Sequence, residues 1–388
     1  MLGGVRRLLL LVSAIMLVDT LFYAALTPLL PHYADTLGLS KTGAGVLTAA
    51  FGVGTLAGSI PAGMLAARTG PKPVVLLGLT LLAATSLAFG FGHSIALLDA
   101  ARFCQGFGGA CTWTGALAWL VSRAPRERRG ELIGSALGAG IAGALLGPLV
   151  GGAAASFGTG PVFSAVAAVG VGIAIAAALG PAGRPDEPQT LAYLLPHLRN
   201  RRLVVGMWLV ALPALLFGVV SVLAPLRLHA LGFGALGISA VFLLSAGVES
   251  VLSPVVGRLA DRHGSAALVR IAALGSAGVT LLLPLVHERF GLGAVVVGAG
   301  LAYGVFWIPA MTGLIEGTES LGLDASFAFA LMNLAWAAGQ GAGSLGGGAL
   351  GGLAGDLAPY WLAAGLCVVT LAAAGLTRPA SRAYPEAT

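Results

Sequence analysis

The chain has 388 residues, of which 57% are hydrophobic and only 9% are charged, against about 25% charged residues in soluble domains. This composition excludes a soluble globular protein. The net charge of +6 is no sign of nucleic-acid binding, because no basic face interleaves with aromatic residues.

Apolar stretches of about 20 residues, each long enough to cross the hydrocarbon core, follow one another along the chain. We predict an all-α integral membrane protein with twelve transmembrane helices in two pseudo-symmetric six-helix halves. Residues 1–180 form the first half, 181–202 a cytoplasmic linker and 203–388 the second half. The first span is too long for a signal-peptide core. The predicted spans are near 8–30, 43–66, 73–92, 96–121, 131–155, 161–180, 203–225, 235–257, 266–286, 292–314, 325–350 and 357–377.

Basic residues set the predicted orientation of these spans. Lys41, Arg227 and Arg289 fall on one side, Arg102 falls inside a span, and the other lysines and arginines fall on the opposite side. Because short cytoplasmic loops carry the excess of positive charge, both termini are predicted to be cytoplasmic. We expect a multi-pass protein of the cell (inner) membrane.

An eight-residue phrase occurs twice, with its copies 194 residues apart, which is half the chain length. Gly63-Met-Leu-Ala-Ala-Arg-Thr-Gly70 recurs as Gly257-Arg-Leu-Ala-Asp-Arg-His-Gly264, each on a predicted cytoplasmic turn. Such a repeat indicates two equivalent halves, and similar halves with a site between them suggest alternating access. The alternative is that both are merely tight basic turns. We assign gating to Gly63, Arg68, Gly70, Gly257, Asp261, Arg262 and Gly264.

The fifth predicted span is the richest in glycine. Glycines let membrane helices approach closely, and a proline bends a helix. We expect this face to let a neighbouring helix slide or tilt, the alternative being generic small-residue packing. Its residues, after Gly134, are Gly143, Gly147, Pro148, Gly151 and Gly152.

Ionisable residues inside spans are the candidates for chemistry, since a charge at a helix centre costs ~3 kcal/mol by insertion scales. Asp19 lies mid-way along the first span, with Tyr23 and Thr27 spaced to share its face. Glu249 lies mid-span in the eighth helix. Each is predicted to bind a proton or a cation. The alternative for each is a structural carboxyl that bonds to a nearby hydroxyl.

Arg102 has Asp99 three residues before it and Gln105 three residues after it. An ion pair with Asp99 is one interpretation. The other is that Arg102 modulates the proton affinity of a carboxylate across a cavity, expected to be Asp19. Glu316 ends the tenth span and is either solvated or a second carboxylate of the site.

Aromatic and amide side chains at helical spacing are predicted to line a central cavity for flat cationic or apolar molecules, where cation–π contacts help. The alternative is that these aromatic stripes face lipid. The predicted lining is Tyr23, Gln105, Trp113, Tyr303, Trp307, Asn333, Trp336 and Gln340.

These motifs together resemble the major facilitator superfamily. The spacing in the fifth span matches the antiporter motif, G-x8-G-x3-G-P-x2-G-G. The repeated turn resembles the family's loop signature, and residues 98–109 resemble its fourth-helix motif, L-x3-R-x2-Q-G-x2-G. Residues 328–347 resemble the eleventh helix of drug:proton antiporters, and the first span is similar to that of vesicular monoamine transporters. The first turn departs from the signature, with Ala67 where the family carries Asp and Pro71 where it carries Arg.

The resemblance implies a drug:proton antiporter like the bacterial multidrug efflux transporters. It implies a cytoplasmic charge lock, which in this chain is either weaker on the amino-terminal side or carried mainly by Asp261 and Arg262. We expect proton-coupled export of small lipophilic or cationic compounds. A proton-coupled importer and a non-transporting receptor or assembly protein stay as alternatives. No phosphate-binding loop, metal-ligand spacing or catalytic cluster stands out, so no nucleotide, cofactor, metal or enzymatic activity is expected.

Overall fold

A computed structural model describes residues 2–125, 128–182, 199–322 and 325–376. Nearly all of them are helical, and this part of the chain contains no strand. The helices are α1 (Leu2–Ala24), a 3-10 turn η1 (Thr27–Leu29), α2 (Leu30–Leu37), α3 (Lys41–Thr69), α4 (Pro71–Phe91), α5 (Ile95–Arg123), α6 (Arg129–Phe157), α7 (Thr159–Leu179), α9 (Arg201–Ala230), α10 (Ala235–His263), α11 (Ser265–Leu282), α12 (Arg289–Gly304), α13 (Trp307–Glu319), α14 (Ala325–Leu353) and α15 (Leu357–Leu376).

The all-α membrane fold predicted from composition is confirmed. Within the described residues, eight helices are long and apolar enough to cross a membrane, and two shorter apolar helices cover 266–282 and 357–373. The count of twelve spans stays a prediction, as do the domain boundaries at 181 and 202. Residues 183–198 of the predicted linker lie outside the described residues.

Two predicted spans differ from the structure because each is interrupted. The first, predicted over 8–30, leaves α-helical geometry after Ala24 and continues through η1 into α2. Pro28 and Pro31 each lack the backbone N–H that a continuous helix needs. The tenth is divided into α12 and α13 around Val305, four residues before Pro309. Thr27 therefore does not continue the helical face of Asp19.

The internal repeat is visible in the backbone. Gly70 and Gly264, which end the two copies of the repeated phrase, have φ values of 85° and 80°. Gly38 and Gly232, at the same sequence offset, have φ values of 66° and 91°. Side chains rarely tolerate this conformation, so glycine is required at both turns. The repeat thus preserves turn geometry as well as sequence.

Polar side chains cap several helices where they begin. Ser40 accepts a hydrogen bond from the Gly43 amide at the start of α3, and Ser94 accepts one from Leu97 at the start of α5. Glu288 accepts from the amides of Phe290 and Gly291 before α12. These two donors hold the pKa of the Glu288 carboxyl below its usual range.

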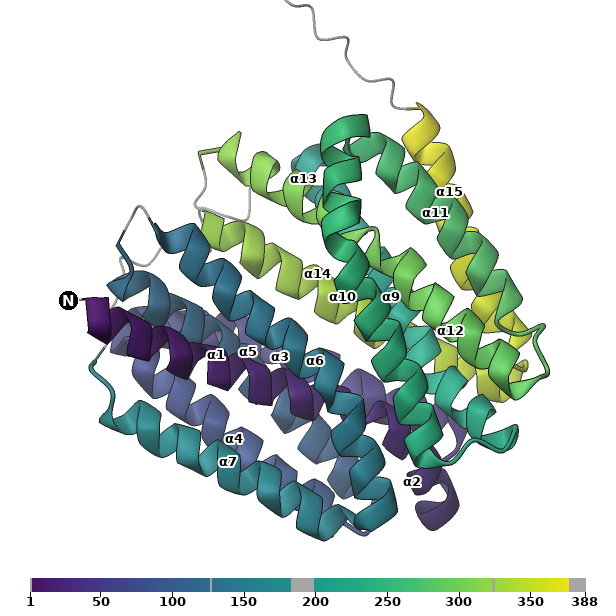
Figure 1. The fold of residues 1–388 in the computed structure, drawn as a ribbon, viewed down its shortest axis with the longest axis horizontal. Coiled ribbons are helices and arrows are strands. Elements are labelled where there is room, and N and C mark those ends of the chain that lie inside the picture. Colours follow the sequence, from purple (N-terminus) through teal and green to yellow (C-terminus); the bar gives the residue numbers. More distant parts are fainter. Residues whose placement is uncertain (1, 126–127, 183–198, 323–324, 377–388) are drawn as a thin grey trace, which may run out of the picture.

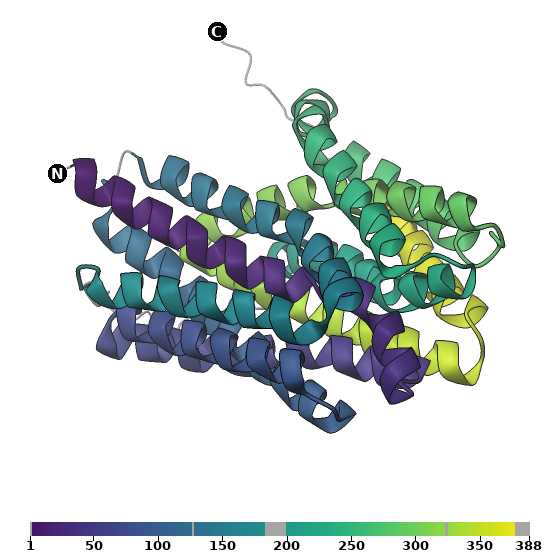
Figure 2. The same cartoon turned by 60° about the horizontal axis from the view of Figure 1, so that its bottom comes forward.

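The helices pack as two groups, α1–α7 and α9–α15, which lie beside each other in Figures 1 and 2. In the first group α1 packs on α6, and α5 lies between α3 and α4. In the second, α9 packs on α14 and α11 on α15. Between the groups, α3 packs on α14 and α6 on α10.

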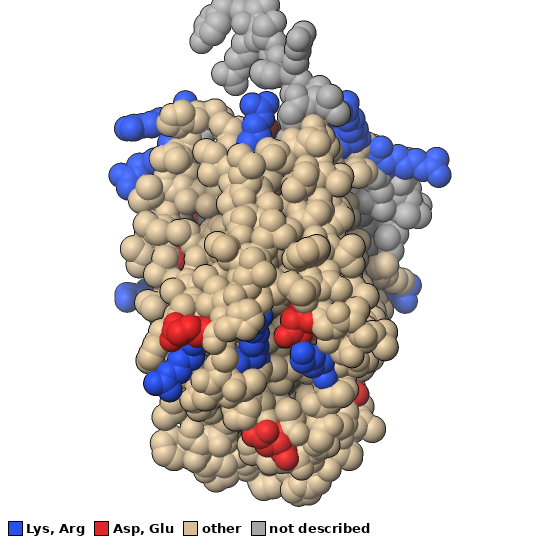
Figure 3. Space-filling model, turned by 90° about the vertical axis from the view of Figure 1, so that its right-hand side faces the viewer, with Lys and Arg blue, Asp and Glu red and all other residues tan. Residues whose placement is uncertain are grey.

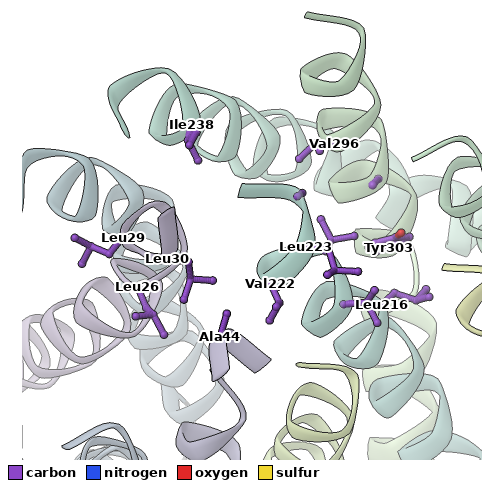
Figure 4. Packing of buried hydrophobic residues seen from close by; sticks show 14 of the residues in the cluster. Leu26, Leu29, Leu30, Ala44, Leu216, Val222, Leu223, Ile238, Val296 and Tyr303 are labelled. Carbon is purple, nitrogen blue, oxygen red and sulfur yellow. The ribbon is translucent and has the colours of Figure 1, made fainter. Parts of the chain in front are cut away.

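The two groups are closed at the end that holds α2. One apolar cluster there draws on both groups, and Figure 4 shows Leu30 and Ala44 opposite Val222 of α9. Lys41 at the start of α3 forms an ion pair with Asp356 before α15. Asp35 of α2 lies 3.0 Å from a ring nitrogen of His229 of α9.

At the opposite end the apolar clusters stay within single groups. One runs from Leu8 to Ala177, entirely within α1–α7, and another runs from Leu203 to Ala335, entirely within α9–α15. Gly152 of α6 faces Ser239 of α10, and from there the α6 and α10 ribbons diverge toward the other end of the bundle in Figure 1. Among the described residues, apolar contacts therefore join the two groups at the α2 end, the closed end, whereas each group packs within itself at the other end, which we call the open end.

On the surface of the second group, charged side chains are separated by an uncharged region. Figure 3 shows a broad uncharged region between basic side chains at the top and a mixed band of acidic and basic side chains in the lower half. Large apolar side chains such as Leu274, Trp361 and Val369 are exposed on this group. An exposed apolar belt between charged ends is what a bilayer-spanning protein presents to lipid.

Candidate functional site

Asp19 lies at the centre of the candidate site, on α1 and facing α5. Its side chain is only 4% exposed. Thr112 donates its hydroxyl to Oδ1 at 3.1 Å, and the indole of Trp113 donates to Oδ2 at 3.1 Å. The carboxyl group thus has two neutral donors, both from consecutive residues of one helix. Gly109 lies beside it, since a Cβ there would come within 3.4 Å of Oδ2.

Arg102 lies on α5 closer to the closed end than Asp19 does, and only 1% of its surface is exposed. Its guanidinium donates to Gln105 Oε1 at 2.6 Å and to the Tyr23 carbonyl at 3.0 Å. It does not pair with Asp99, one carboxyl oxygen of which has no hydrogen-bond partner, so the interpretation of Arg102 as an ion-pair partner of Asp99 is wrong. It also forms no ion pair with Asp19.

Aromatic rings enclose the Arg102 guanidinium. Its central carbon lies 5.1 Å from the centre of the Tyr23 ring and 4.8 Å from that of Phe51. Trp336 of α14 packs edge-on against Tyr23, with ring centres 5.4 Å apart. Cation–π contacts of this kind stabilise a buried cation that has no carboxylate partner. Trp336 brings the second helix group into the same cluster.

Glycines allow α5 to approach α3 closely enough for these contacts. A Cβ on Gly106 would overlap the Phe51 carbonyl oxygen, and one on Gly54 would overlap the Phe103 carbonyl. The two backbones are therefore in direct contact beside Arg102. This explains why glycine follows Gln105 in the fourth predicted span.

The predicted glycine face of α6 packs on α1, the helix that carries Asp19. Added Cβ atoms on Gly143 and Gly151 would overlap the carbonyl oxygens of Leu17 and Ala25, and one on Gly147 would lie 2.6 Å from that of Leu21. Pro148 is buried within α6.

Gly152 faces the other way. A Cβ there would overlap the Ser239 hydroxyl of α10. The motif therefore contacts both groups, one along α1 and the other through Gly152.

The second carboxylate, Glu249, lies on α10 away from the Asp19 cluster. Its side chain packs against α12, where a Cβ on Gly304 would lie 2.8 Å from Oε1. Ser245, one turn earlier, donates to the Val296 carbonyl at 3.4 Å. Glu316 is exposed on α13.

The remaining predicted lining residues are divided between the cluster and other parts of the second group. Tyr303 is fully buried, with its hydroxyl 2.8 Å from that of Thr280 and its ring against Phe217. Trp307 packs in the apolar cluster of α9, α13 and α14. Gln340 is buried and Asn333 half-buried on α14. The structure brings together Asp19, Tyr23, Arg102, Gln105, Trp113 and Trp336.

The predicted gating turns lie at the open end. Arg68 is exposed at the end of α3, and Arg262 is exposed at the end of α10. Gly63 and Gly257 lie within these helices. The Asp261 side chain lies outside what the structure describes, so its part in a charge lock stays a prediction.

Sequence reasoning missed two residues of the cluster, Thr112 and Phe51. Phe51 is a single aromatic in an apolar span, and Thr112 has the local bond to a helix carbonyl that threonine often makes. The available signal for Thr112 was its position directly before Trp113, which the sequence analysis had singled out.

A model of the Major Facilitator Superfamily matches residues 12–323. The chain belongs to this superfamily. A chloramphenicol resistance protein of Streptomyces lividans is 31% identical over 360 residues, which covers 89% of this chain and 90% of the relative. The quinolone resistance protein NorA of Staphylococcus aureus is 29% identical over 125 residues, 32% of each chain.

Solved structures of transporters share the fold. The xylose transporter XylE from E. coli superposes with a TM-score of 0.75 at 15% identity, over 97% of this chain and all of that one. The nucleoside transporter NupG gives a TM-score of 0.73 at 16% identity, over 95% and 98%. These structures share the fold, and the family match makes the chain a multi-pass membrane transporter for a small molecule, with two drug-resistance proteins among its relatives. Its family is one of transporters and not of enzymes.

Proposed function

We propose that the protein exports small lipophilic or cationic organic compounds across the cell membrane in exchange for protons. Asp19 is the carboxylate that couples the two movements. The observation that carries this proposal is the buried Asp19 carboxyl group with neutral donors on both oxygens and no cationic partner. An unpaired carboxylate inside a membrane protein is costly unless it takes part in function.

Competition for one carboxylate explains the coupling. With no arginine paired to it, Asp19 is neutralised by either a proton or a cationic substrate. Binding of the cation then requires that the proton leave, so the two move in opposite directions. The resistance proteins of Streptomyces lividans and Staphylococcus aureus support export as the direction.

The aromatic cluster supports the substrate class. Tyr23, one helical turn after Asp19, packs its ring against Phe51 and Trp336, and Trp336 comes from the second helix group. A flat apolar or cationic molecule bound there would contact both groups. The proposal also includes a central cavity, with Glu249 and Glu316 as further carboxylates for protons.

The closed end of the structure is extracellular under the predicted orientation, with both termini in the cytoplasm. The protein would then be open to the cytoplasm, ready to take up a compound for export. The glycine face of α6 would allow α1 to slide or tilt against it when the molecule opens to the outside.

Reconstituted protein provides the test. Purified protein in proteoliposomes should move a fluorescent organic cation when a pH gradient is imposed, in the direction opposite to the protons. Asp19→Asn should lose this transport while still inserting, and Glu319→Gln, a change at an exposed carboxyl outside the proposed site, should keep it.

Proton release gives the decisive measurement. Addition of the cation in weak buffer should release protons from the wild type and not from Asp19→Asn. Equal release from both would move the coupling role to Glu249. Flux of a compound in the same direction as protons would indicate an importer, and no flux for any compound would indicate a receptor.

A further inference from the structure

The two oxygens of Asp19 have partners of different chemical capacity. Oδ2 accepts from the Trp113 indole N–H, and Oδ1 accepts from the Thr112 hydroxyl. An indole N–H only donates, whereas a hydroxyl both donates and accepts. A proton on Oδ2 would face a donor and leave one of the two groups unsatisfied. A proton on Oδ1 faces a group that can accept it.

The Thr112 hydroxyl has a second acceptor within reach. Its oxygen lies 2.9 Å from the carbonyl oxygen of Gly109, one turn earlier in α5, and 3.1 Å from Asp19 Oδ1. One hydroxyl hydrogen serves one of these two acceptors at a time. Thr112 is fully buried, so water does not supply a third alternative.

We propose that Thr112 is a hydrogen-bond switch that lets Asp19 gain and lose its proton through rotation of one hydroxyl hydrogen, with the heavy atoms of both side chains in place, an inference that rests on the proposed function. In the ionised state Thr112 donates to Oδ1. When a proton forms an O–H bond at Oδ1, the hydroxyl of Thr112 rotates to donate to the Gly109 carbonyl and accepts from Asp19. On release the proton returns to solvent and the rotation reverses.

Each state then satisfies every polar group in the cluster. Trp113 donates to Oδ2 in both states and fixes the proton on Oδ1. Buried hydrogen-bonding groups without partners are costly, so a site that must exist in two protonation states benefits from a partner that serves both. Thr112 is thus a positioning residue that acts through Asp19.

Few other titratable or charged groups face this carboxyl. From α5 they are Arg102 and Cys111. On its own helix, the nearest titratable residue is Tyr23, one turn later. α6 presents glycines to α1, and Gly140 packs against the Trp113 ring. Arg102 makes its two hydrogen bonds with Gln105 and Tyr23, so it does not compete for the Asp19 oxygens.

The test compares Thr112→Val, which keeps the shape and removes the hydroxyl, with Thr112→Ser, which keeps the hydroxyl. Infrared difference spectra report the C=O stretch of protonated Asp19, assigned by its loss in Asp19→Asn. The band should move to higher frequency in the valine variant and stay in place in the serine variant. The pH midpoint of cation-induced proton release should rise by about one unit in the valine variant alone, since the ionised form loses the stronger hydrogen bond.

An unchanged band and midpoint in Thr112→Val would overturn the switch. If that variant does not insert, Trp113→Phe tests the other oxygen. Its carboxyl band should split in two, because Oδ2 then no longer faces a fixed donor, and a single unsplit band would contradict the proposal. If the wild type releases no protons on cation binding, the proposed function fails. The infrared titration of Asp19 still tests the switch in that case.

Discussion

At the scale of single residues, the site keeps a carboxylate and an arginine apart although both are buried. Ion pairing would satisfy both charges, but it would also remove the need for Asp19 to take up a proton. Arg102 instead uses a side-chain amide, a backbone carbonyl and two aromatic rings. This arrangement leaves Asp19 available to a mobile cation.

Arg102→Lys should therefore impair transport although it conserves charge. An ammonium cannot make two planar hydrogen bonds while it lies between two rings. Loss of one charged hydrogen bond costs about 1.5–3 kcal/mol, so we expect at least a roughly tenfold lower initial rate in proteoliposomes. Arg123→Lys is the matched control on the same helix, because Arg123 is exposed and should tolerate the change. A wild-type rate in Arg102→Lys would refute this role.

Sequence reasoning identified most of this cluster but not its pairings. Asp19, Arg102 and Trp113 stand out in apolar spans. Their contacts depend on how each helix is rotated about its axis, and glycine-rich spans with apolar residues on every side carry little information on rotation. Sequence therefore left Arg102 with two interpretations, a pair with Asp99 or an effect on Asp19, and gave no sign of its bond to the Tyr23 carbonyl on another helix.

At the scale of helices, the glycine face of α6 fixes how closely α1 lies. Three carbonyls spaced four residues apart, those of Leu17 and Leu21 in α1 and of Ala25 just after it, each face a glycine of α6. Small residues on α6 thus let the two backbones lie in direct contact along this face.

Gly147→Leu should abolish transport and leave membrane insertion intact. The new side chain would meet Ala24 and the Leu21 carbonyl and would force α1 away from α6. Gly138→Leu on the same helix is the control, since nothing lies within 4 Å of a Cβ at that position. The measurement is the transport rate of both variants, normalised to the amount of protein in the membrane. Normal transport by the Gly147 variant would reduce the motif to incidental packing.

The interrupted helices show what hydropathy does not resolve. Pro28, Pro31 and Pro309 were visible in the sequence, but the apolar character continues across each interruption. Because spans are predicted from average hydrophobicity, the first and tenth appeared continuous. The sequence predicted that these helices exist, but it did not predict that each is interrupted.

At the scale of the molecule, the sequence predicted the internal repeat but did not predict which end of the bundle is closed. The repeated phrase and its glycines predicted equivalent turns, which the backbone angles of Gly70 and Gly264 match. Which end is closed depends on a small free-energy difference between two packings of the same helices. No local sequence signal reports such a balance.

Orientation can be tested by labelling. In a cysteine-free background, cysteines at positions 41 and 289 should react with an impermeant reagent in intact cells, and those at 128 and 201 should react only after permeabilisation. The expectation follows from the asymmetry of basic residues. Labelling of position 201 in sealed cells would contradict the twelve-span arrangement.

The contact between α3 and α14 has a consequence for biosynthesis. Gly45 touches Gly348, about 300 residues later in the chain. At about 5–20 residues per second, translation separates the two by roughly 15–60 s. During that interval the glycine face of α3 can be covered only by lipid or by a transient chaperone. The last stage of folding is then an exchange in which α14 displaces that cover, and a nascent chain stalled before residue 325 would hold the Asp19 cluster without the helix that completes it.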